Sequence, residues 1–391
     1  MSGPVVIAPG ATKDKHCFLG EVIASTIAAI TVRDRRDERR IRTFTYSPNL
    51  AAKMAGIVAK GNFQPGDKVE ISCRVGRNEA YAIKDNPSVP RWGRLVPAPP
   101  VTASSFPLRQ PAVAGKFYPR NPSELATMVD GFSFRGPSAG NFLNNTGADA
   151  TTTRTRTTAQ ACLVPHAGYI YSGRVAGAVY GTVKIPSRVI LIGPRHYPIG
   201  EDLAVVSSGK WLTPLGEATI DIPLAQELKR ACHSLREDEL AHRREHSLEV
   251  QLPFLQRARP DFTFVPIVLG TDRWEALENI GHALAAVISA QHEPVLLIAS
   301  SDMNHYEPDD ITRVKDNVAI ERLLALDARG LFDTVRRERI SMCGYSPTVC
   351  TLIAARELGT HHAELVRYAT SGDVNGDREQ VVGYAGMIFH G

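Results

Sequence analysis

The sequence of 391 residues lacks features that define several large classes of protein. No apolar run approaches the roughly 20 residues that a membrane-spanning helix needs. The first residues also lack the basic start and the long apolar core of a signal peptide. These two absences predict a cytoplasmic protein that does not associate with membranes.

Cysteine scaffolds and several common catalytic motifs are missing as well. The six cysteines are scattered and form no CxxC pair, which argues against a disulfide framework and a zinc ribbon. Without GxSxG, P-loop or GxGxxG motifs, serine hydrolase, NTPase and dinucleotide-binding functions lose their main sequence support. With 43% hydrophobic and 22% charged residues, the composition is that of an ordinary globular protein, and the length predicts two domains.

Residues 1–90 predict a small β-barrel of the OB-like kind. One helical piece near 50–58 interrupts short segments of strand character at 20–24, 28–32, 41–46, 66–73 and 79–84. Basic residues are dense at 33–40, but acidic residues break this run, as in a solvated hairpin tip. Aromatic residues that could stack on bases are few here, so nucleic-acid binding is not expected.

Two further segments stand out by composition. Residues 91–110 are rich in proline and predict an interdomain linker. Residues 136–159 are rich in threonine and asparagine and predict a disordered surface loop. The second domain is therefore expected at 111–391, with this loop as an insertion.

The second domain is expected to be an α/β fold with a largely parallel sheet covered by helices. Apolar strand segments alternate with helical ones, which is typical of sheets buried on both faces. A helix is predicted at 171–183, and strands are predicted at 161–164, 188–192, 262–269, 295–299, 366–370 and 381–389.

Side chains capable of chemistry follow three of these strands. His166 and His196 each come directly after an apolar strand, and Asp302 with His305 follows a third. Ligands gather at the carboxyl ends of strands in open α/β sheets, so these groups are expected to converge. The alternative for each is a structural role, as a turn residue or a cap.

Cys343 lies just ahead of a predicted helix at 348–358. Ser346 is expected to be its N-cap and Pro347 to lie in its first turn, which places the thiol at the positive end of a helix dipole. This environment favours a thiolate. Together with the two strand-end histidines, a thiolate would make a metal site. A buried, inert cysteine is the alternative.

The segment 244–253 predicts a helix that places His246 and Glu249 on one face. His242 and His246 are four residues apart, but the residues between them do not form the HExxH pattern of zinc proteases. His246 is therefore a candidate for the same site, without a motif of its own.

Six motifs occur in a fixed order over the second domain: PAVAGKFYP (111–119), PHAGY (165–169), GPRH (193–196), EHSLE (245–249), SSD (300–302) with His305, and CG (343–344). In this order they resemble the Memo family, also called AmmeMemoRadiSam system protein B. The fold of that family is similar to the class III non-haem extradiol dioxygenases. Residues 1–100 lie outside the resemblance.

The resemblance implies that His166, His196 and Cys343 occupy the metal-ligand positions. In the dioxygenases a carboxylate is the third ligand, which suits Fe(II), whereas a thiolate stands in its place here. Iron (Fe²⁺) is the first expected metal. Copper or zinc is the alternative, because thiolates favour softer ions.

The resemblance also implies roles for three further residues. His305 matches the acid/base histidine of the dioxygenases, Asp302 is expected to orient it, and His246 to line the pocket. The expected function is a non-haem metal-dependent oxidoreductase. The alternative is a non-enzymatic protein that holds a peptide or an anionic group in the same cleft. Expected partners are a small-molecule or peptide ligand and a radical-SAM protein, with which family members are associated in genomes.

Overall fold

The computed structural model describes residues 108–133 and 156–391, and six strands nearer the start of the chain. The chain divides into two units, Met1–Ala103 and Ser104–Gly391. The helical piece expected near 50–58, most of the linker expected at 91–110 and most of the loop expected at 136–159 lie outside the described residues.

The first unit contains strands β1 (Val5–Ile7), β2 (Lys15–Ser25), β3 (Ala29–Asp34), β4 (Ile41–Tyr46), β5 (Lys68–Arg74) and β6 (Glu79–Asp85). They pair in the order β1-β6-β4-β3-β2-β5, and β5 also pairs with β6. β4 and β6 run parallel, and the other pairs in this sheet run antiparallel. Strands β6, β4, β3, β2 and β5 therefore form a closed ring of pairings.

Five parallel strands form the centre of the second unit's sheet. In spatial order they are β8 (Ala161–Val164), β15 (Val295–Ser300), β9 (Arg188–Pro194), β14 (Thr263–Leu269) and β12 (Gly216–Ile220). The first four are apolar at nearly every position, as expected for strands buried on both faces, whereas in β12 exposed and buried residues alternate.

Antiparallel pairs flank this centre on both sides, so the sheet as a whole is mixed. On the β8 side the strands are β18 (Val381–His390), β17 (His362–Thr370) and β16 (His305–Glu307). On the β12 side they are β11 (Lys210–Thr213) and then β7 (Leu108–Arg109), which runs parallel to β11. Off this path lie β10 (Leu203–Val205), which pairs with β14, and β13 (Arg236–Glu237), which pairs with β10.

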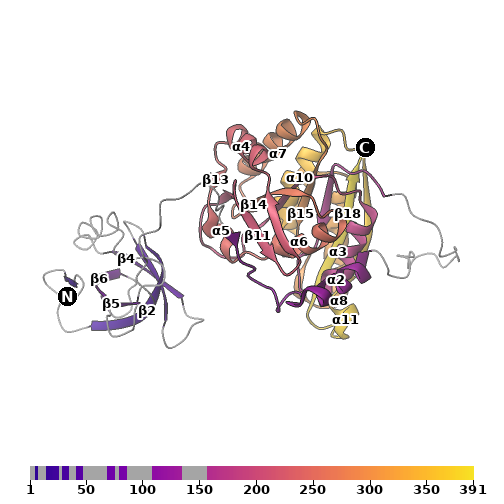
Figure 1. Cartoon of the computed structure of the whole chain (residues 1–391). Coiled ribbons are helices and arrows are strands. Elements are labelled where there is room, and N and C mark those ends of the chain that lie inside the picture. Colours follow the sequence, from indigo (N-terminus) through magenta and orange to yellow (C-terminus); the bar gives the residue numbers. More distant parts are fainter. Residues whose placement is uncertain are drawn as a thin grey trace. The chain divides into compact units, whose positions relative to one another are not determined.

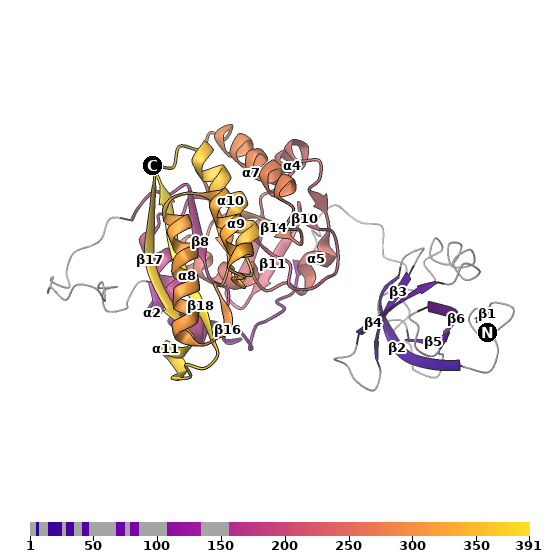
Figure 2. The same cartoon turned by 180° about the vertical axis from the view of Figure 1, so that it is seen from behind.

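Successive residues of the central strands face two separate cores. Leu297 and Ala299 of β15 belong to one core, and Leu296 and Ile298 to the other. The first core packs against α4 (Ile222–Ala231), α7 (Trp274–Ser289), α8 (Asp309–Leu324), α9 (Ala328–Arg337) and α10 (Tyr345–Glu357) (Figure 2). The second packs against α2 (Pro122–Ser133), α3 (Tyr169–Thr182) and α6 (Leu252–Ala258) (Figure 1). The second unit is thus an α/β fold with a helical layer on each face of the sheet.

The remaining helices are short: α5 (Glu239–Arg243), the 3-10 turn η1 (Glu249–Gln251) and α11 (Gly372–Asn375). Within the described part of the chain, no helix has both the length and the apolar character needed to span a bilayer.

The segment 244–253 does not form the single helix expected from its sequence. His246 lies in the turn between α5 and η1, so the prediction that it shares a helical face with Glu249 is wrong. The two backbone N–H groups that follow Glu245 bind its carboxylate instead of helical carbonyls. Pro253, which has no N–H to donate, then falls in the first turn of α6, where it is tolerated.

Candidate metal centre

His166 lies directly beyond the carboxyl end of β8 and is almost fully buried, with 1% of its surface exposed. Its Nδ1 is 3.0 Å from Ser300 Oγ. Ser300 has one hydroxyl proton, which it donates to the Ser247 carbonyl at 2.6 Å. Nδ1 must therefore be the donor in its contact with Ser300. The lone pair of His166 Nε2 is left free.

Burial also keeps the His166 ring in the form that binds metals. Burial lowers the pKa of His166 well below its usual value, and the neighbouring His196 and His246 act in the same direction. A neutral imidazole with a free Nε2 is the ligand form of histidine.

His196 follows β9, and Glu245 fixes its orientation. The Glu245 carboxylate accepts hydrogen bonds from the backbone N–H of His196 at 2.7 Å and from His196 Nδ1 at 2.8 Å. Although burial raises the pKa of Glu245, the hydrogen bonds and charges around it lower that pKa to about 2. An ionised carboxylate only accepts, so Nδ1 carries the proton and Nε2 is free.

Cys343 supplies the third group from the loop before α10. Its Sγ lies 3.2 Å from His166 Nε2 and 3.7 Å from the carbonyl oxygen of Asp302. Gly344 makes this approach possible, because a Cβ at that position would lie 2.4 Å from the Ser300 carbonyl oxygen.

Two expectations about Cys343 are wrong. The helix begins at Tyr345 with Gly344 as its N-cap, so Ser346 lies inside the helix and does not cap it. Burial raises the pKa of the Cys343 thiol, and the Asp302 carboxylate adds to the effect. Without a metal, the thiol therefore keeps its proton.

The three predicted ligands converge on one point. One donor atom each of His166, His196 and Cys343 lies within 4.8 Å of the other two. In a tetrahedral zinc-type site such atoms are about 3.3 to 3.6 Å apart, given metal–ligand distances of about 2.0 to 2.3 Å. The donor set therefore fits a single divalent ion after small side-chain movements.

A second group, formed by His196, Glu245 and His246, also brings three donor atoms together. Its carboxylate is already occupied by four N–H donors: the backbone and ring of His196, and the backbone of His246 and Ser247. We therefore assign Glu245 to positioning His196, not to holding a metal.

The other predicted site residues surround this cluster. The His246 ring stacks on that of His196, with centroids 4.4 Å apart, and lies 4.7 Å from the ring of Phe117. Burial lowers the pKa of His246 to about 4, so the ring is neutral at physiological pH. His246 thus lies beside the rings of both candidate histidine ligands.

Asp302 was expected to orient His305, but the two side chains are attached to different partners. The Asp302 carboxylate accepts from the backbone N–H of His166 at 2.8 Å and of Ala167 at 3.2 Å, so it positions the His166 loop. His305 is held instead by Ser341, whose carbonyl accepts from His305 Nδ1 at 2.9 Å and whose hydroxyl accepts from the His305 backbone N–H. His305 Nε2 is thereby left as the free nitrogen of the ring.

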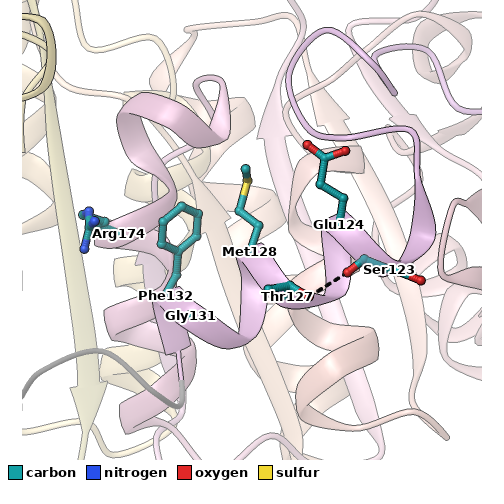
Figure 3. Close-up of a pocket in the computed structure, with 7 residues that line it drawn as sticks. All are labelled: Ser123, Glu124, Thr127, Met128, Gly131, Phe132 and Arg174. Carbon is teal, nitrogen blue, oxygen red and sulfur yellow. Dashed lines mark hydrogen bonds between the residues drawn. The ribbon is translucent and has the colours of Figure 1, made fainter.

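A surface hollow lies away from these residues. It runs along one face of α2 and is closed at one end by Arg174 of α3 (Figure 3). Its lining consists of Ser123, Glu124, Thr127, Met128, Gly131, Phe132 and Arg174. None of the six predicted site residues belongs to it, so it is separate from the candidate centre.

The fold and the cluster define an α/β protein with a candidate two-histidine, one-cysteine centre at the ends of parallel strands. The sequence profile of the Memo-like protein family matches residues 109–388. A MEMO1 family protein of Methanopyrus kandleri is 40% identical over 285 residues, which cover 72% of this chain and 98% of the relative. The chain belongs to the Memo family, as its motifs predict.

Relatives from distant organisms show the same extent of similarity. A MEMO1 family protein of Methanosarcina barkeri is 41% identical over 286 residues, and one of Aquifex aeolicus is 39% identical over 283 residues. Each alignment covers 72% of this chain and 99% of the relative. The second unit therefore corresponds to nearly the whole length of these relatives.

Proposed function

We propose that the second unit binds one divalent metal ion through His166, His196 and Cys343. The observation that carries this proposal is that hydrogen bonds to Ser300 and Glu245 place a proton on Nδ1 of both histidines. Both Nε2 atoms then carry a lone pair, and that of His166 faces the Cys343 thiol at 3.2 Å. A bound ion would displace the thiol proton, because the thiolate is the form that binds metals.

We further propose that the metal serves a non-haem oxidoreductase, with iron as the first choice and copper or zinc as alternatives. Three protein ligands leave coordination positions open, and a redox-active metal there would supply activation of a bound substrate or of O₂. His305 would accept or donate a proton at Nε2, because Ser341 holds its other nitrogen. His246 would contact the substrate beside the metal.

A binding function without catalysis is the second candidate, and the thiol favours it. In the metal-free protein, Cys343 and His166 satisfy each other through the 3.2 Å contact. The cleft would then be a stable metal-free site for a peptide or an anionic group. Metal content and O₂ consumption separate the two candidates.

The deciding experiment uses protein purified without a histidine tag. Metal content is measured by mass spectrometry after loading with Fe²⁺, Cu²⁺ or Zn²⁺, and O₂ consumption is followed with reductants and catechol-type phenols. We expect about one ion per chain, and turnover with a redox-active metal. A fully metallated protein without activity across these substrates would support the binding function.

For the first unit we propose an OB-like barrel that docks a partner. The order of its strands supports the barrel, because β5 pairs with both β2 and β6 while β4 and β6 run parallel. The unit lies outside the family match at 109–388 and would contribute nothing to the metal site. Deletion of residues 1–100 should therefore leave metal binding intact, and a truncated protein that loses its metal would contradict this modularity.

A further inference from the structure

Arg109 is bound on three sides at the start of the second unit. Its Nη1 forms an ion pair with Glu249 at 2.7 Å, and the two side chains are 10% and 0% exposed. Nε donates to the His242 carbonyl at 2.9 Å and Nη2 to the Glu245 carbonyl at 2.7 Å. The guanidinium carbon also lies 4.1 Å from the centre of the Trp211 ring.

Glu249 fixes Arg109 from the other side. Besides Arg109, its carboxylate accepts hydrogen bonds from the backbone N–H of Ala112 at 2.7 Å and of Val113 at 3.0 Å, and from Tyr118 Oη at 2.7 Å. The buried charge of Glu249 is therefore fully partnered. Arg109 is held rigidly and can act as a fixed point for the backbone that it binds.

The two carbonyls that Arg109 binds bracket the segment that leads into Glu245. One belongs to His242, near the end of α5, and the other to Glu245 itself. The Glu245 carboxylate in turn binds the backbone and Nδ1 of His196. A continuous chain of contacts thus runs from the Arg109 guanidinium through Glu245 to the imidazole of a proposed metal ligand.

We propose that Arg109 is a positioning residue, which holds Glu245 so that His196 presents its unprotonated Nε2 to the metal. This inference rests on the proposed metal site. The planar guanidinium reaches both carbonyls and Glu249 at once because its N–H donors point in fixed, divergent directions. A lysine has its donors on one atom, so it can keep the ion pair with Glu249 but cannot brace both carbonyls.

The test uses the full-length chain and the variant Arg109→Lys. Co²⁺ affinity is measured by chelator competition. In the metal-free protein, ¹⁵N NMR of labelled histidine reports which ring nitrogen of His196 carries the proton. We expect Co²⁺ affinity to fall about tenfold, at the lower end for groups that orient a ligand, and the Nδ1–H form of His196 to lose population.

Arg257→Lys is the matched control. Arg257 is likewise an arginine paired with a carboxylate: its two hydrogen bonds, both 2.8 Å, go to Asp130 and not to the candidate centre. Arg257→Lys should change neither the Co²⁺ affinity nor the position of the proton on His196. Trp211→Phe is the second variant. It keeps Arg109 but replaces the ring beneath the guanidinium with a weaker cation–π partner. We expect a smaller loss of Co²⁺ affinity and of the Nδ1–H form than in Arg109→Lys.

The outcomes separate this inference from the metal proposal. If the parent binds no Co²⁺, the metal proposal fails, and the His196 proton position still tests Arg109. If Arg109→Lys does not fold, Trp211→Phe decides. Unchanged Co²⁺ affinity together with an unchanged His196 tautomer, in whichever of the two variants shows a native circular dichroism spectrum, overturns the inference.

Discussion

Cys343 Sγ lies 3.2 Å from His166 Nε2, although 177 residues separate the two in the sequence. Two sets of hydrogen bonds hold the loops that make this contact. Asp302 binds the backbone of the His166 loop, and the backbone N–H of Gly344 donates to Ser301 Oγ at 2.9 Å. Residues that follow β15 thus bind the loops that carry both groups, so the end of one central strand sets the geometry of the centre.

Replacement of Cys343 by serine should lower metal occupancy sharply. A serine hydroxyl is a poor ligand for a soft or borderline ion, so we expect affinity to fall by more than about tenfold, the smallest loss typical of changes around a metal ligand. Cys232→Ser is the control, because that buried thiol packs in the first core and pairs with the Ser234 hydroxyl, away from the candidate centre. Equal metal content in Cys343→Ser and the parent would exclude the thiolate as a ligand.

Gly344→Ala should disturb the centre without removing a ligand. The added Cβ would lie 2.4 Å from the Ser300 carbonyl oxygen and 2.5 Å from Ser301 Cβ, so the loop that carries Cys343 must shift. We expect lower stability, by about 1 to 3 kcal/mol for overpacking, and weaker metal binding. Gly131→Ala is the control, because its new methyl group meets no atom within 4 Å. Gly131 lies in α2, and alanine favours the helix over glycine, so this variant should be more stable by about 0.5 to 1 kcal/mol. Thermal unfolding and metal titration of both variants check this.

His305→Gln should keep the metal and lose turnover, if the protein is an oxidoreductase. Glutamine keeps much of the volume and can still bond to Ser341, but it cannot carry a proton. We expect turnover to fall about 100-fold or more, as for a lost general acid or base. His292→Gln, at an exposed position, is the control. Turnover equal to that of the parent would remove His305 from the mechanism.

Asp316 should make the protein less stable as pH rises toward neutrality. Burial raises the pKa of this carboxyl from 3.8 to about 7, against opposing hydrogen bonds from Tyr368 and Asn304. Because the pKa of Asp316 is higher in the folded than in the unfolded protein, its protonated carboxyl stabilises the fold. This stabilisation is fully present below about pH 4 and is lost as pH rises through about 7. Between these two pH limits, the free energy of unfolding should fall by an amount on the order of 4 kcal/mol.

The variant Asp316→Asn should remove this slope. We expect it to be more stable than the parent at pH 8, with the advantage shrinking as the pH is lowered toward 4. Denaturant unfolding at several pH values measures the difference between the two proteins, in which the contributions of other titrating groups cancel. A constant difference across this range would show that Asp316 ionises normally in the folded protein.

Much of the fold follows from local patterns in the sequence. Four of the five central strands were predicted because they are continuous apolar segments, and His166 and His196 because each comes directly after one. β12, in which exposed and buried residues alternate, was not predicted. The antiparallel margins of the sheet were harder to predict, since their strands are short or partly exposed and depend on pairing partners far away in the sequence.

The surroundings of the site were less predictable than its ligands. Glu245 lies in a recognised motif, but its four hydrogen bonds depend on a turn that its own carboxylate creates. Arg109 gives no local signal, because its hydrogen-bond partners lie more than 130 residues away: the separation is 133 residues for His242 and 140 for Glu249. The state of the Cys343 thiol was mispredicted for a similar reason, since burial comes from the whole fold and the helix dipole from the neighbouring sequence.

The position of β8 between β15 and β18 has a consequence for how the protein is made. β8 carries His166, yet both of its neighbouring strands lie much later in the chain. At about 5 to 20 residues per second on the ribosome, Cys343 is added about 10 to 35 seconds after His166. A nascent chain therefore has an unpaired β8 until β15 has been made, and an incomplete set of candidate ligands until Cys343 has been added. If the proposed centre binds a metal, loading can be completed only after Cys343 has been added, and a cell short of that metal would accumulate chains with an empty centre.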